Sequence, residues 1–173
     1  MKKLLIITLI FISNLCVAQK INNDSIKVKI NAVSLNFFGT TPVSGIAYER
    51  IISNRSSIEF GLGYVYFKND ISAGIGYKFY LNKIDVNKIK FYTGLSVLYQ
   101  NHGSIYTLDD FAGYIPFGIS YFSKKGYFWG VDIGPSIGTS TMEEMNQYEE
   151  NKIYIVHHTM FGPYLGLKFG YRF

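Results

Sequence analysis

Apolar and polar residues alternate along much of this chain, and the pattern is clearest from Phe161 to Phe173. Odd positions there are apolar, whereas even positions are mainly glycine or charged residues. A period of two is that of a β-strand with two different faces. Glycine suits a solvent-exposed strand face poorly, because it packs nothing and costs conformational entropy. It suits the narrow interior of a small barrel whose large apolar side chains face lipid.

The same alternation predicts eight strands, an even number as single-chain bacterial barrels require. In the first strand the apolar parity changes, so that either a bulge lies near Ala32 or the membrane strand begins near Ile30. We therefore expect an all-β fold, an eight-stranded antiparallel up-and-down transmembrane β-barrel. The expected strands are Ile26–Phe38, Val43–Ile52, Ser57–Phe67, Ile71–Leu81, Ile89–Asn101, Ala112–Ser123, Tyr127–Ser140 and Ile153–Phe173.

The connections between these strands support this topology. The two longest, His102–Asp110 and Thr141–Lys152, fall at the same end of the barrel, which is the extracellular end if the N-terminus lies in the periplasm. Asn69-Asp70 is expected to form a two-residue turn. Prolines inside the last three strands are harder to accommodate, because each removes a donor from the hydrogen-bond ladder. Bulges or positions above the membrane would accommodate these residues, which are Pro116, Pro135 and Pro163.

The N-terminal segment has the features of a secretory signal peptide. Lys2 and Lys3 precede an apolar run that is too short to span a bilayer. A cleavage site of small residues follows this run and ends at Ala18. We expect cleavage after Ala18, which would leave residues 19–173 as the barrel domain and remove the only cysteine, Cys16. The mature chain would then have no disulfide.

The C-terminal strand ends on alternating aromatic residues, Phe169, Tyr171 and Phe173. This resembles the last strand of bacterial outer-membrane barrels, and the whole mature chain resembles small barrels of the OmpA or OmpX kind. The resemblance implies a location in the outer membrane, contact with its lipid and lipopolysaccharide, and recognition of the terminal aromatic residues by the barrel-assembly machinery. It names no activity.

Composition and charge agree with a β-rich envelope protein. The chain holds 15 Tyr, 14 Phe and 17 Gly, a combination typical of all-β chains. Loss of Lys2 and Lys3 with the signal would lower the formal charge from +5 to +3. The remaining basic residues are scattered, with no cluster expected on one face, so we expect no nucleic-acid partner.

Charged residues also occupy inward positions of the expected strands, and we interpret them as an ion-pair network that plugs the lumen. Glu49 and Glu59 lie equally far from Asn54, so a simple hairpin places them opposite each other. Lys78, whose expected partner is Gly61, would lean toward Glu59. An eight-stranded barrel has room only for its own side chains, so we expect no appreciable conduction. The expected network is Glu49, Glu59, Lys78, Asp132 and Lys168.

Three weaker motifs point to other chemistry. His102 and Ser104, with Asp109 and Asp110 nearby, resemble a hydrolase constellation such as that of outer-membrane lipid A deacylases. The adjacent pair His157-His158 points to opposite strand faces and cannot easily share a metal ion. Four carboxylates in the Thr141–Lys152 segment lack the ligand spacing of a calcium loop. We expect no catalytic, metal or cofactor site.

Three functions therefore compete. The first is a non-enzymatic outer-membrane barrel with a structural or surface-interaction role. The second is a lipid-modifying enzyme that uses His102 and Ser104. The third is a secreted, soluble lipocalin-like barrel, in which the large apolar side chains would point inward around an apolar ligand.

Overall fold

The chain forms a closed β-barrel in a computed structural model that describes residues 28–41, 44–65, 70–101, 107–145 and 153–173. Its strands are β1 (Asn31–Phe38), β2 (Ser44–Ser53), β3 (Ser56–Val65), β4 (Asp70–Tyr80), β5 (Ile89–Asn101), β6 (Thr107–Tyr114), β7 (Phe117–Phe122), β8 (Tyr127–Met145) and β9 (Ile153–Arg172). Neighbouring strands are antiparallel, and β9 pairs with β1 to close the barrel. The expected signal peptide lies outside the described residues.

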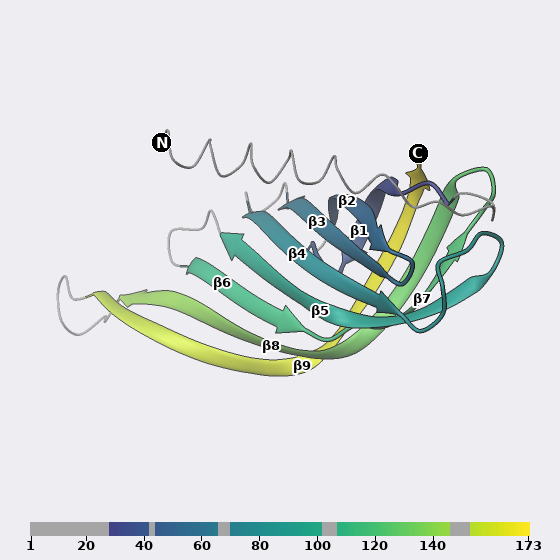
Figure 1. The fold of residues 1–173 in the computed structure, drawn as a ribbon. Coiled ribbons are helices and arrows are strands. Elements are labelled where there is room, and N and C mark those ends of the chain that lie inside the picture. The colour runs from purple at the N-terminus through teal and green to yellow at the C-terminus, as the bar shows by residue number, and fades with distance from the viewer. Residues whose placement is uncertain (1–27, 42–43, 66–69, 102–106, 146–152) are drawn as a thin grey trace, which may run out of the picture.

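The nine segments form an eight-stranded barrel, because β6 and β7 are two parts of one strand position between β5 and β8. The all-β, eight-stranded, up-and-down architecture expected from the sequence is thus confirmed. The connections after β2, β4 and β7 lie at one end, which we call the turn end, and β1, β3, β5 and β8 run toward the other end, which we call the loop end (Figure 1). The β8–β9 hairpin, green and yellow in Figure 1, runs past the other strands at the loop end.

Several strand limits differ from the expectation. The structure shows no bulge at Ala32, because β1 begins at Asn31 and pairs regularly with β2. Asp70 is not part of a two-residue turn, since it opens β4 opposite Val65. The expected loop at His102–Asp110 was too long, because β6 already begins at Thr107. The expected loop at Thr141–Lys152 was also too long, since β8 extends to Met145 by pairing with β9.

The three prolines that interrupt the expected strands lie close together in the barrel wall. Pro116 interrupts the expected sixth strand and separates β6 from β7. Pro135 lies opposite Pro163, and its carbonyl accepts a bond from the Ile115 N–H at 3.1 Å, so its backbone polar groups point away from β9. Pro163 faces the other way, beyond the last β1 pair at Gly166. The missing proline N–H groups therefore fall at a break or beyond a partner strand, where few ladder bonds are lost.

Strand alternation gives the wall two chemically different faces. In β1 the buried residues are Ala32, Ser34 and Asn36, whereas Val33 and Leu35 are exposed. The buried set as a whole is mostly polar or charged, and the exposed set contains large apolar residues from every strand. The protein is therefore apolar outside and polar inside, the reverse of a water-soluble barrel. Among the described residues, none forms a helix that could cross a membrane.

Candidate functional site: the charged lumen

The lumen site begins with two carboxylates that face each other. The β2–β3 register places Glu49 directly opposite Glu59, as their equal distance from Asn54 predicted. Both residues are only 1% exposed. Like charges directly opposite on a sheet repel each other, and more strongly where water is excluded. This pair therefore needs cations around it.

Lys78 on β4 supplies the first of these cations. Its Nζ donates to Glu49 Oε2 at 2.9 Å and also pairs directly with Glu59 Oε2. The partner across the sheet is Ser57, and the expectation of Gly61 was wrong because the β3–β4 connection is centred two residues earlier in the chain than Asn69-Asp70. Lys78 therefore lies diagonal to Glu59 on the neighbouring strand, and it reaches this carboxylate as expected.

Lys168 on β9 connects Glu59 with the far wall. Its Nζ lies 3.2 Å from Glu59 Oε2 and 3.5 Å from Asp132 Oδ2. Asp132 on β8 faces Gly166 across the sheet, and the Tyr92 hydroxyl donates a hydrogen bond to Asp132 Oδ2. Lys168 therefore joins Glu59 on β3 to Asp132 on β8.

Arg172 is a sixth member of the network that the sequence interpretation missed. Its Nη2 donates to Glu49 Oε1 at 2.8 Å, and Tyr80 donates to the same oxygen at 3.2 Å. The guanidinium carbon lies 4.3 Å from the ring centre of Phe122 and 5.1 Å from that of Phe128. The sequence could have identified Arg172, because it lies four residues after Lys168 in the same strand and therefore faces the lumen too.

We call these six residues the lumen network: Glu49, Glu59, Lys78, Asp132, Lys168 and Arg172. It holds three carboxylates and three cations, each at most 5% exposed. The ionised network is therefore neutral as a whole, which limits the cost of burying its charges.

Side chains and a turn close the lumen on both sides of this network. Toward the turn end, buried Tyr80, Tyr92, Phe122 and Phe128 pack together. Toward the loop end, the chain after β1 folds inward, and Thr40 donates to Glu59 Oε1 at 2.8 Å. A cavity of about 10 Å³, room for about one water molecule, lies between the network and this inward segment, where Thr40, Glu59 and Lys168 help to line it.

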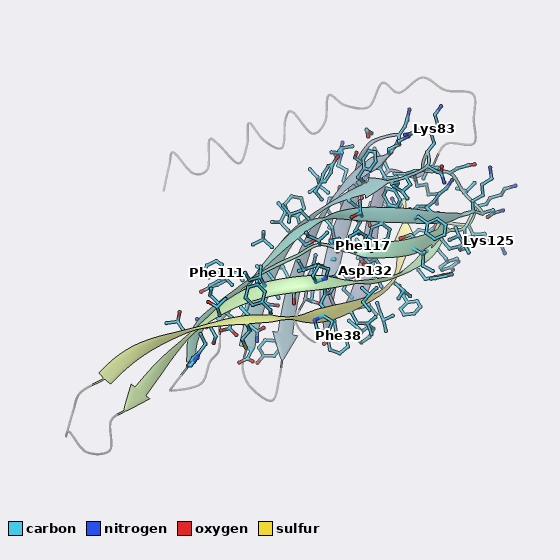
Figure 2. The ribbon with its side chains drawn as sticks, turned by 90° about the horizontal axis from the view of Figure 1, so that it is seen from below. Phe38, Lys83, Phe111, Phe117, Lys125 and Asp132 are labelled. Atoms are coloured by element: carbon cyan, nitrogen blue, oxygen red, sulfur yellow. The ribbon has the colours of Figure 1, made fainter. Side chains whose placement is uncertain are left out.

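Phe38 and Gly39 produce this inward turn because both have positive φ, 61° and 73°. Facing glycines make room for it. A Cβ at Gly74 would lie 2.5 Å from the Thr40 carbonyl oxygen, and one at Gly61 would lie 2.8 Å from the same atom. Glycine on the inner face thus serves to admit a segment of main chain. Figure 2 labels Phe38 and Asp132, which mark this region of the wall.

The other candidate chemistry receives no geometric support from the described residues. His102, Ser104, Glu149 and Glu150 lie outside them, whereas Glu143 and Glu144 belong to β8. His157 and His158 are consecutive in β9, opposite Thr141 and Ser140. Within the described part of the chain, no group of three or more His, Cys, Asp or Glu residues is placed to hold a metal ion.

Comparison with known proteins adds no family to this geometry. No protein-family model, no curated protein and no solved structure matches the chain. The arguments below therefore rest on the barrel itself.

Proposed function

We propose that this protein is a non-enzymatic barrel of the bacterial outer membrane, with a plugged lumen and a structural or surface-interaction role. The observation that carries the proposal is the outer surface. Exposed fractions reach 68% for Leu62, 57% for Ile133 and 78% for Phe161. A monomer in water rarely exposes so continuous an apolar surface, whereas a lipid bilayer would cover it.

The order of side chains along the wall fits a bilayer. Aliphatic residues such as Leu35, Ile75 and Leu165 occupy the middle of their strands. Aromatic pairs lie nearer the ends, with Tyr127–Tyr171 at the turn end and Tyr99–Phe111 toward the loop end. Outer-membrane barrels carry two such aromatic girdles at the two membrane interfaces.

The interior argues against a soluble carrier of an apolar ligand. Charged groups and aromatic rings of the described residues fill it, and the cavity beside Glu59 and Lys168 has room for about one water molecule. Large apolar side chains lie outside instead: Ile119 and Leu167 are half-buried there, and the exposed ones include Phe60, Leu62, Ile75, Tyr77, Phe117 and Leu165. A lipocalin-like barrel requires the opposite arrangement, with apolar side chains around a ligand cavity.

The β8–β9 hairpin supports the surface-interaction part of the proposal. The pairing of β1 with β9 ends at Phe38 and Gly166. Among the described residues, the preceding part of β9, from Ile153 to Leu165, pairs with β8 alone. Its other edge presents backbone donors and acceptors that a partner strand can use.

Heat-modifiable electrophoretic mobility tests the proposal. Protein refolded into detergent or lipid should run differently on a denaturing gel before and after boiling, because a closed barrel resists cold detergent. The shifted species should also fractionate with outer membranes. Protein that stays in solution without detergent and shows no mobility shift would contradict the proposal.

A further inference from the structure

The turn end of the barrel is strongly basic. The turns after β2, β4 and β7 carry Arg55, Lys83, Lys88, Lys124 and Lys125, all exposed. We call these five residues the basic rim. Asp85 is the single acidic residue in these turns and pairs with Lys88 at 3.1 Å. The other four cations have no acidic partner among the described residues.

This concentration of charge corrects the sequence interpretation, in which the basic residues were scattered. They are scattered along the chain, but alternate turns of an up-and-down barrel meet at one end. Lys83 and Lys125, labelled in Figure 2, lie at the same end, far from Phe111. The strands at the loop end carry acidic residues, among them Asp70 and Asp110.

The rim lies beside the aromatic girdle of the turn end. Tyr121 and Trp129 stack with their ring centres 6.2 Å apart, within a few residues of Lys124 and Lys125. Lys29, also at this end, donates to the Tyr171 hydroxyl at 3.1 Å. Aromatic girdles lie at the head-group level of a bilayer. Cations just beyond them reach the lipid phosphates.

We propose that the basic rim binds the head groups of anionic phospholipids in the leaflet next to the turn end. The inference rests on the proposed membrane location. The cations come from three turns around the circumference, which fits the ring of lipids around a barrel better than one compact ligand. Phosphates accept hydrogen bonds from lysine and arginine, and an anionic surface attracts basic residues next to it.

Lipid selectivity in bilayers tests this inference. Spin-labelled phosphatidylglycerol and phosphatidylcholine are compared for their fraction in contact with the barrel. We expect the parent protein to favour phosphatidylglycerol about two- to fivefold, since one lysine or arginine near an anionic surface gives at most about a fivefold preference for each lipid that it contacts. The preference should fall toward equality in the triple variant Lys83→Gln, Lys124→Gln, Lys125→Gln. It should also weaken in 1 M salt, where the Debye length is about 3 Å.

The triple variant Lys83→Arg, Lys124→Arg, Lys125→Arg is the matched control, because it keeps the charges and should keep the preference. Equal selectivity in the parent and the glutamine variant would overturn the inference. The gel mobility shift is measured on the same samples to separate the two proposals. If the parent protein shows the gel mobility shift but no lipid preference, only the proposed binding of anionic lipids by the basic rim is contradicted. If it shows no mobility shift, the proposed membrane location is contradicted, and the inference fails with it.

Discussion

At the scale of single residues, the barrel depends on Lys78 to hold two facing carboxylates together. Glu49 and Glu59 are opposite each other in a buried position, and Lys78 pairs with both. Each carboxylate has one further cation, Arg172 for Glu49 and Lys168 for Glu59. Removal of Lys78 would leave each acid one partner and give the network an excess negative charge.

We predict that Lys78→Met lowers the free energy of unfolding by about 3 kcal/mol, the lower end of the range for a broken buried ion pair, because the other cations remain. Adding Glu59→Gln should recover much of that loss, since it restores neutrality. Urea titrations in lipid measure both effects. Lys88→Met is the control, because Lys88 and Asp85 form an exposed pair and should change stability by less than about 1 kcal/mol. A Lys78→Met protein as stable as the parent would refute the pairing.

Much of this network could be predicted from strand parity. All five expected charges are buried in the lumen, because alternation decides which face a residue occupies. The approach of Lys78 to Glu59 could be predicted as well, but partners across the lumen could not, since they depend on how far each strand is staggered against the next. Lys168 reaches Glu59 because β9 closes against β1 at a register that no local pattern encodes.

At the scale of elements, the inward turn after β1 is the feature that sequence periodicity could not show. It contains no strand pattern, and its site is set by glycines on β3 and β4 that are distant in sequence. Thr40 donates to Glu59, so the turn and the lumen network stabilise each other. The break at Pro116 could not be predicted either. Strand periodicity runs through this proline although a proline cannot donate to the ladder, and the structure resolves the conflict by ending β6 before it and placing Pro135 and Pro163 nearby.

We predict that Gly74→Ala destabilises the barrel by about 1–3 kcal/mol, the usual cost of overpacking, because its Cβ would lie 2.5 Å from the Thr40 carbonyl oxygen. Gly162→Ala is the matched control, since a Cβ there meets no atom within 4 Å. Thermal or urea unfolding of both variants provides the comparison. Equal stability of the two would show that the turn does not occupy the lumen.

At the scale of the whole molecule, the account depends on an apolar exterior that faces lipid. Leu62 is 68% exposed near the middle of the wall, and Leu81 is 56% exposed at the turn end. In a bilayer these two leucines would lie at different depths. The penalty for a charged side chain depends on that depth.

We predict that Leu62→Arg lowers stability in bilayers by about 2–4 kcal/mol, whereas Leu81→Arg costs about 0–1 kcal/mol near the interface. Folding titrations in lipid vesicles give both values. Equal and small costs at the two positions would mean that the wall contacts water, as it would in a soluble barrel.

The quenching of Trp129 fluorescence tests the membrane location most directly, because it is the only tryptophan in the chain and lies in β8 near the turn end. Lipids brominated along their acyl chains quench an indole that touches the bilayer, and iodide quenches one in water. The account predicts strong quenching by lipids with bromine near the head groups, weaker quenching by bromine at the chain ends, and little quenching by iodide. Strong quenching by iodide, with none by any brominated lipid, would contradict it.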